Sequence, residues 1–283
     1  MKSLTWVSDS GAVIQFNQSF PFYVSGADLN TAGASFSEMK PAGMDGVYTA
    51  GGSYDVKIIR CPGQIVATSP ADLERRRNQL AMACNVRREG WLVSHQHDGT
   101  RRKIRCRPTH NPEFEGSFGL GEKFTVEFRC DRPYWLSYDE IIQPIGQIIP
   151  LMAWPWAAPV LMGYAVAELT LHNGTGIEIP TRIEVLSHST LIKLTRTCGA
   201  DAAVLEVAAA IAEGQKLVID GTTGDIFLQD LETGETANAS NRLAAGSRPI
   251  TLLPGENRIE LDNGVAGATP LSYIIYNEHS LAV

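Results

Sequence analysis

The sequence has no cysteine pattern of the kind that builds a disulfide framework or a zinc site. Its 283 residues include five cysteines, an odd number, and no two of them have Cys-x-x-Cys spacing. Both kinds of site need cysteines that are paired or closely spaced. We therefore expect buried free thiols and neither a metal nor another cofactor. The cysteines are Cys61, Cys84, Cys106, Cys130 and Cys198.

Catalytic motifs are missing as well. The sequence contains no Gly-x-Ser-x-Gly elbow, no His-Glu-x-x-His zinc motif, no phosphate-loop lysine and no dinucleotide fingerprint. His95 and His97 fall on one face of an expected strand, but without a third ligand packed or exposed histidines are favoured over a metal pair. A glycosidase needs two carboxylates on opposite sides of a cleft, and nothing in the sequence indicates that acidic neighbours such as Glu113 and Glu115 are placed in that way. No catalytic residue is assigned, which favours a binding or structural role over an enzyme.

Basic residues are scarce in the second half of the chain. The net charge is −7. Residues 1–140 hold 17 Lys and Arg against 16 Asp and Glu, and the remainder holds 7 against 15. Phosphates need Lys and Arg, so the second half is a poor candidate for binding DNA or an anionic membrane. From Arg75 to Arg107, however, ten basic residues stand against two acids. This stretch is either a solvated face balanced by acids elsewhere, or a contact surface for nucleic acid or an acidic protein.

Long apolar segments of the membrane type are absent. The first residues, MKSLTWVSDSGAV, lack the apolar run of a secretory signal, so we expect synthesis in a cytoplasm. Residues 141–167 carry no charge, but the prolines at 144, 150, 155 and 159 are incompatible with a regular spanning helix. We interpret residues 139–164 as an apolar, proline-rich connector that is buried or covered by a partner, and we expect no membrane insertion.

The length predicts two domains, and the seam follows the stretch FTVEFRCDRPYW. In it, Phe124, Val126, Phe128 and Cys130 alternate with polar residues, which is the period of a half-buried strand. Pro133 lacks a backbone N–H and stops that strand. We place the first domain at residues 1–138.

The first domain is predicted to be α+β, mainly strands with one helix. Ser69, Pro70 and Asp72 are an N-cap, a first-turn proline and a first-turn acid, so a helix begins there. Residues 54–60 alternate as a strand with Tyr54, Val56 and Ile58 on one face, and Asp98-Gly99 predicts a hairpin turn. Lys40–Ser53 is rich in glycine and predicts a loop or a long hairpin tip.

Residues 165–283 are predicted to form an antiparallel β-sandwich. About nine short apolar-alternating segments are separated by turn residues, a pattern typical of two packed sheets. Jelly-roll and galectin-like layouts are both compatible with it. The turn dipeptides include Asn173-Gly174, Asp220-Gly221 and Asn263-Gly264.

Three features in order resemble the distal tail protein family of long-tailed bacteriophages, the siphophage baseplate hub. The first is KPAGMDGVYTAGG followed by a strand, and the second is VEFRCDRPYW, in which Arg132 is inserted between Asp131 and Pro133. The third is the succession LHNGTGIEIPTRIEV, AEGQKLVIDGTTGDIFL and LLPGENRIEL. The resemblance covers most of the chain.

The resemblance implies a structural protein of the virion tail, made in the bacterial cytoplasm. It implies that the first domain forms a hexameric ring through a protruding hairpin, with a galectin-like domain outside. Implied partners are further copies, the tail tube, a tail-associated hub protein and possible receptor-binding proteins, with DNA only as passing cargo. The implied oligomer contacts are Pro41, Gly43, Gly46, Tyr48 and Gly51. A basic subunit-contact or channel face would be Lys103, Arg105 and Arg107.

The alternative function is a carbohydrate-binding sandwich or a glycan-active enzyme. Fold does not carry function, and a sugar site requires an exposed aromatic platform with polar partners. After residue 165 the sequence has no tryptophan. We interpret Tyr164, Tyr273 and Tyr276 as strand residues, so sugar binding is the less favoured alternative.

Overall fold

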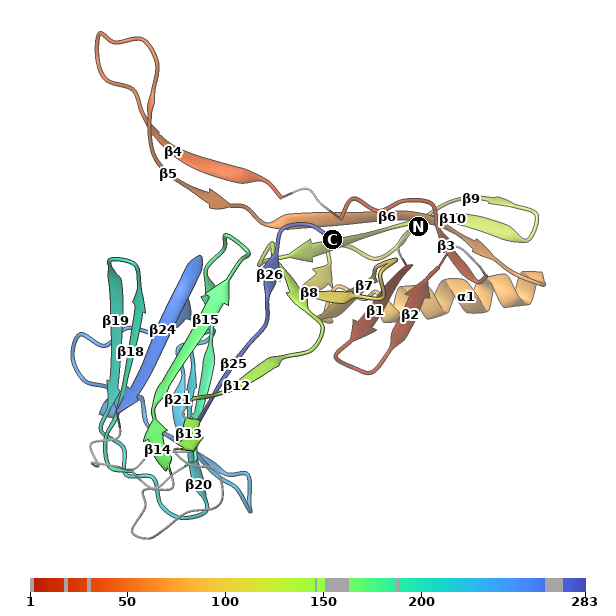
Figure 1. The fold of residues 1–283 in the computed structure, drawn as a ribbon. Coiled ribbons are helices and arrows are strands. Elements are labelled where there is room, and N and C mark those ends of the chain that lie inside the picture. The colour runs from red at the N-terminus through yellow and green to blue at the C-terminus, as the bar shows by residue number, and fades with distance from the viewer. Residues whose placement is uncertain are drawn as a thin grey trace. The chain divides into compact units, whose positions relative to one another are not determined.

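The computed structural model describes residues 3–17, 20–29, 32–145, 147–150, 163–186, 189–262 and 272–283. The chain divides into two compact units. The first consists of residues 1–138 with residues 280–283, and the second of residues 139–279 (Figure 1). Strands dominate both units and the first contains the α-helix of the described chain, as the sequence predicts.

The first unit is built on one large antiparallel sheet. Its central path runs β2-β1-β7-β8-β10-β6-β3, with β9 beside β10 and β11 beside β8. A bridge between Asn17 and Tyr23 joins the two ends of the path, so the sheet closes on itself around a core. Its strands are β1 (Ser3–Ser8), β2 (Val13–Phe16), β3 (Phe22–Val24), β6 (Lys57–Val66), β7 (Gly90–His95), β8 (Arg101–Pro108), β9 (Glu113–Phe118), β10 (Gly121–Cys130), β11 (Trp135–Ser137) and β26 (His279–Ser280).

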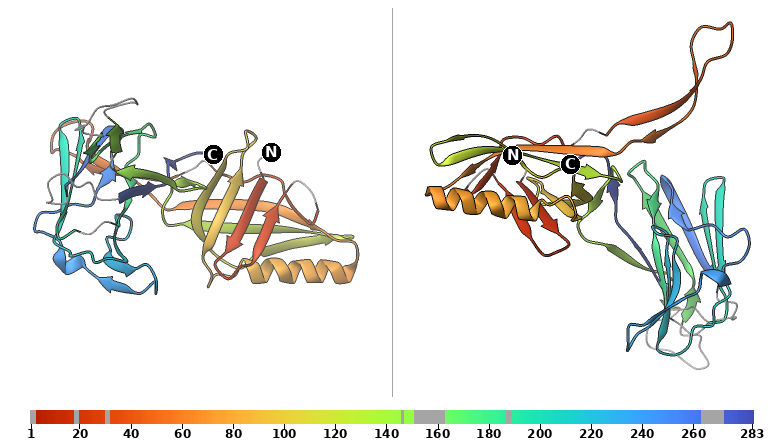
Figure 2. Two further views of the ribbon diagram at one scale, coloured as in Figure 1. Left: turned by 60° about the horizontal axis from the view of Figure 1, so that its bottom comes forward. Right: turned by 180° about the vertical axis from the view of Figure 1, so that it is seen from behind.

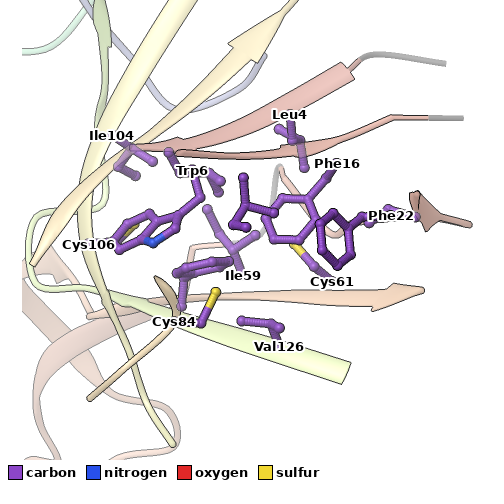
Figure 3. Close-up of a cluster of buried hydrophobic side chains, with 14 of the residues drawn as sticks. Leu4, Trp6, Phe16, Phe22, Ile59, Cys61, Cys84, Ile104, Cys106 and Val126 are labelled. Carbon is purple, nitrogen blue, oxygen red and sulfur yellow. The ribbon is translucent and has the colours of Figure 1, made fainter. Parts of the chain in front are cut away.

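The core of the first unit collects the inward side chains of these strands. Trp6, Phe16 and Phe22 turn toward Cys61 and Val126 (Figure 3). The apolar phase of β10 is buried, and β10 ends at Cys130, three residues before Pro133, as its sequence predicts. Four of the five cysteines are free and buried here, which confirms the expectation of buried thiols for Cys61, Cys84, Cys106 and Cys130.

Helix α1 (Pro70–Ala83) begins where its capping residues predict. The Ser69 hydroxyl accepts a hydrogen bond from the Asp72 amide, and Pro70 occupies the first helical turn. At the other end, the indole N–H of Trp6 donates to the Ala83 carbonyl at 3.0 Å. Figure 2 shows α1 lying along the side of the first unit's sheet. No helix in the described part of the chain is long and apolar enough to cross a membrane.

A two-stranded hairpin interrupts the first unit between β3 and β6. Strands β4 (Ala34–Met39) and β5 (Tyr48–Tyr54) pair only with each other, and every residue in both is exposed. The segment predicted as a loop or hairpin tip, Lys40–Ser53, is therefore the turn and most of one arm. Figure 1 shows the hairpin extending beyond the end of β6.

The strand predicted from Tyr54 to Arg60 is divided between β5 and β6, and its apolar face turns outward. Tyr54, Val56 and Ile58 are 46%, 36% and 43% exposed. The alternate residues Lys57 and Ile59 are buried at 1% and 0%. Alternation gives the period of a strand but not which phase faces the core.

The second unit consists of two main sheets that enclose a second core. One sheet has the order β12-β25-β17-β20-β21-β22, and the other β15-β24-β18-β19. Two small pairs, β13-β14 and β16-β23, accompany them. The elements are β12 (Ile141–Ile145), β13 (Gln147–Pro150), β14 (Gly163–Val166), β15 (Glu168–Asn173), β16 (Ile179–Pro180), β17 (Arg182–Val185), β18 (Ile192–Cys198), β19 (Asp201–Val207), β20 (Gln215–Asp220), β21 (Ile226–Asp230), β22 (Thr236–Asn238), the 3-10 turn η1 (Ser240–Arg242), β23 (Thr251–Leu252), β24 (Gly255–Asp262) and β25 (Ser272–Tyr276).

Part of the predicted connector, residues 139–164, belongs to the sandwich. Strand β12 pairs with β25 along its length, from Ile141 opposite Tyr276 to Ile145 opposite Ser272. Pro144 is tolerated because β12 pairs with one neighbour only and is an edge of its sheet. Residues 141–145, which begin the uncharged run, therefore belong to the sandwich and do not only link the domains. Its Trp154-Pro155-Trp156 run and the Asn263-Gly264 turn lie outside the described residues.

Candidate assembly surface

The two faces of the β4–β5 hairpin differ in chemistry. Ala34 lies opposite Tyr54 and Phe36 opposite Gly52, which places Phe36 and Tyr54 on one face. Near the base, the other face has small residues, with Ser35 opposite Ser53 and Ser37 opposite Gly51. Beyond a register shift after Ser37, Met39 lies opposite Tyr48, so this second face becomes apolar toward the turn.

The apolar side chains of the hairpin are unusually exposed. Phe36 is 62% exposed, Met39 67% and Tyr48 64%. An isolated two-stranded hairpin is marginally stable in water, and clustered exposed apolar residues mark interaction sites. The hairpin thus has the composition of a surface that is covered in an assembly.

This apolar surface continues from the hairpin onto the first unit. Tyr54, Val56 and Ile58 share one phase of the chain, and Phe36 lies on the same hairpin face as Tyr54. We call these four residues the apolar stripe. The Tyr54 ring also meets the Tyr134 ring edge-on, with centroids 6.0 Å apart.

The base of the hairpin is fixed to the chain beside it. The Ser35 hydroxyl donates to Asp55 Oδ1 at 2.7 Å, and the Asp55 amide donates to the Gly33 carbonyl at 2.9 Å. A β-carbon added to Gly33 would lie 3.1 Å from Asp55 Oδ2. These contacts set the direction in which the hairpin leaves the first unit.

The structure brings all the predicted oligomer contacts together in this hairpin. Pro41, Gly43 and Gly46 lie in the turn, and Tyr48 and Gly51 lie on β5. Gly43 and Gly46 have φ values of 77° and 95°, a left-handed conformation that favours glycine.

Sequence reasoning did not select Phe36, Val56 or Ile58 as contact residues. The sequence offers one signal: Lys57 and Ile58 are adjacent, so in a strand one of them faces the core and the other faces solvent. Ordinary burial preferences would place Ile58 in the core, so only the fold shows that Lys57 is buried there and Ile58 is exposed.

The predicted basic face is largely neutralised within the first unit. Lys103, Arg105 and Arg107 do share the outer side of β8. The Arg105 guanidinium binds both carboxylate oxygens of Asp9, at 2.8 and 2.5 Å, and also reaches Glu89 Oε2 at 3.2 Å. The hydrogen bond from Arg105 lowers the pKa of Asp9 below its ordinary value.

Arg107 is paired in the same way. Its Nη2 lies 2.6 Å from Asp131 Oδ2, and Arg129 Nε lies 2.9 Å from the other oxygen of that carboxylate. Hydrogen bonds from Arg129 and Arg107 lower the pKa of Asp131. Lys103 instead lies over aromatic rings, 5.3 Å from the centre of Trp91. Of the two interpretations of the basic stretch, these contacts favour charge balance by acids elsewhere in the fold.

The other candidate ligands and acids do not converge on a site. Within the described residues, no group of three or more His, Cys, Asp or Glu side chains is placed to hold a metal. His95 Nε2 lies 3.3 Å from the Thr5 hydroxyl. Glu113 instead faces His110, 3.9 Å from its Nε2.

The second unit has a shallow polar depression of about 480 Å³ over β15, β24 and β18. Arg258 lies in it between two carboxylates, 2.7 Å from Glu168 and 3.0 Å from Glu260. None of the residues that line it is aromatic. The depression therefore lacks the stacking platform that a sugar site requires.

Comparison with known proteins agrees with the fold. Residues 9–130 match the family described as phage tail protein RIFT-related domain. The Dit protein (gp 19.1) of phage SPP1, described as a hub adsorption apparatus in phages infecting Gram-positive bacteria, is 14% identical with a TM-score of 0.70 over 98% of both chains. A chain of the phage P2 baseplate, in its activated conformation with Ca, is 10% identical with a TM-score of 0.57 over 100% of this chain and 99% of its own. None of the curated proteins compared with the chain matches it.

Within the first unit, residues 9–130 thus match a phage tail protein domain. Over 98% of its length the chain has the fold of the SPP1 Dit protein, which agrees with the resemblance to the siphophage distal tail family. The mainly β architecture is confirmed by the fold, and the match to a phage tail domain agrees with the predicted place in the virion tail.

Proposed function

We propose that the protein is the architectural hub at the distal end of a siphophage tail tube, and that six copies close into a ring. The observation that carries the proposal is the fully exposed hairpin, whose apolar face continues into the apolar stripe. The phage tail domain supports the role in the tail, and the resemblance to the distal tail family supports six as the number of copies.

The hairpin suits a head-to-tail contact between neighbouring copies. A hairpin on one copy that binds a different surface of the next is a heterologous contact, and such contacts form a ring when the rotation from copy to copy closes. Strands of six and seven residues span roughly 20 Å, enough to reach across a neighbour. Pro41, Gly43, Gly46, Tyr48 and Gly51 then lie at or near the contact.

The proposed partners follow from the position of a hub. The ring would meet the tail tube on one side, and a tail-associated hub protein, with receptor-binding proteins, elsewhere. DNA would pass through it only as cargo, and Lys103 would be the least neutralised member of the basic face toward it. The role is structural rather than enzymatic.

Deletion of residues 41–52 tests the proposal. We expect light scattering to report a hexamer for the intact chain and smaller species for the deletion, with six-fold rings in negative-stain images of the intact chain alone. Circular dichroism and thermal unfolding serve as controls, because the hairpin adds nothing to the core of the first unit. An oligomer of unchanged mass after deletion would contradict the role of the hairpin, and an intact chain that is monomeric would contradict the ring.

A further inference from the structure

A buried lysine on β6 holds the returning end of the chain. Lys57 is 1% exposed, although burying an ammonium group is costly without a partner. Its Nζ donates a hydrogen bond to the backbone carbonyl of Leu281 at 3.2 Å. The same Nζ lies 5.7 Å from the centre of the Trp135 ring, which is itself 0% exposed.

Residues 279–283, here called the strap, have a defined conformation in the first unit. Strand β26 pairs with β11. The Ser280 hydroxyl donates to the Ala282 carbonyl at 2.5 Å, and Val283 belongs to the first unit's core at 9% exposure. The strap thus combines strand pairing, an apolar anchor and the Lys57 hydrogen bond.

The strap gives the chain a second connection between its units. The chain leaves the first unit after Tyr138 and returns to it at Ser280. While the strap is bound, the second unit is attached at both of its ends. If the strap is released, only the connection after Tyr138 remains.

We propose that the strap is a releasable fastening, and that Lys57 is the residue that holds it closed over Trp135. Closure keeps the Lys57 hydrogen bond and buries Val283, whereas release returns the ammonium group to water. Opening of the strap exposes only residues 279–283 and their partners, so it needs less free energy than unfolding of the first unit.

Lys57→Met tests the fastening in the full chain. Methionine keeps most of the length of the side chain and removes the Nζ donor, which leaves the Leu281 carbonyl without this hydrogen bond. We expect the backbone amides of residues 279–283 and 135–137 to exchange with deuterium roughly tenfold faster, while β18 and β19 keep their rates. Lys123→Met, at an exposed position on β10, is the matched control and should leave all these rates unchanged.

Unchanged or slower exchange of the strap in Lys57→Met would overturn the proposal. If that variant unfolds the first unit, which faster exchange in β7 and β8 would reveal, Val283→Asp decides, because it prevents the anchor from entering the core and leaves Lys57 in place. We expect the same local opening with β7 and β8 protected, and a protected strap would overturn the proposal. Small-angle X-ray scattering should show a broader distribution of sizes once the strap is open, and an identical curve would overturn its role as a second connection.

Discussion

The ring of Phe36 lies against the backbone of Gly52 on the facing strand of the hairpin. A β-carbon added at Gly52 would be 2.9 Å from Phe36 Cδ1, closer than such atoms approach in folded proteins. Because Phe36 is exposed, its ring can swing into solvent, so a substitution would change the apolar stripe without unfolding the domain.

Gly52→Val should therefore weaken assembly and leave the first unit folded. The displaced ring no longer forms the continuous apolar surface with Tyr54, and we expect a lower oligomer mass by light scattering at an unchanged midpoint of thermal unfolding. Gly174→Val, in the second unit, is the control, since a β-carbon there would meet only the His172 ring, at an ordinary contact distance of 3.8 Å. Equal assembly of the two variants would show that the position of Phe36 does not matter.

The thiols should divide into one reactive and four protected groups. Burial raises the pKa of Cys61 to about 12 and also raises the pKa of Cys84, and the reactive thiolate is scarce at neutral pH. Cys198, on β18, is only half-buried and therefore accessible to a reagent. We expect a disulfide reagent to modify one thiol per native chain and five after denaturation. Fast modification of a second thiol would show that the core opens locally.

Asp72 should make the stability of the first unit depend on acid. Its carboxylate binds Arg75 and accepts hydrogen bonds from Thr68, and these contacts lower its pKa from 3.8 to about 2. A carboxyl whose folded-state pKa is lowered adds stability above the unfolded value, and this stability is lost as pH falls from about 4 through 2.

Asp72→Asn should accordingly lower the thermal midpoint at pH 7, and the difference from the wild type should shrink as the pH falls toward 2. The exposed Glu74→Gln on the same helix is the control and should change little. A deficit in Asp72→Asn that persists at pH 2 would assign the effect to packing rather than to charge.

Contact of the basic face with DNA would be limited by its internal ion pairs. Asp9→Asn removes the closer of the two carboxylate partners of Arg105, so we expect tighter binding of a short DNA duplex by fluorescence anisotropy, with affinity that falls as salt rises. Asp225→Asn, in the second unit, has the same change in net charge and should not tighten binding. A DNA affinity that changes neither with salt nor with Asp9→Asn would contradict contact between this face and DNA.

The candidate surface was only partly accessible from the sequence. The glycine content of residues 40–53 indicates a turn, and the family resemblance supplies its role in assembly. Phe36 and Ile58 were not selected, because their exposure depends on which side of each strand the fold covers. The pairing of Arg105 with Asp9, 96 residues away, could not be inferred from spacing.

Local chemistry determined the elements of this protein. Ser69, Pro70 and Asp72 begin the helix, Asp98-Gly99 turns between β7 and β8, and alternation with a following proline bounds β10. These signals act within a few residues, so they can be recognised from the sequence alone. The tertiary structure decided which phase of β6 faces inward, that Ile141–Ile145 pairs with β25, and that Leu281 returns to Lys57. Each of these depends on contacts between distant segments, whose free energy exists only once both are in place.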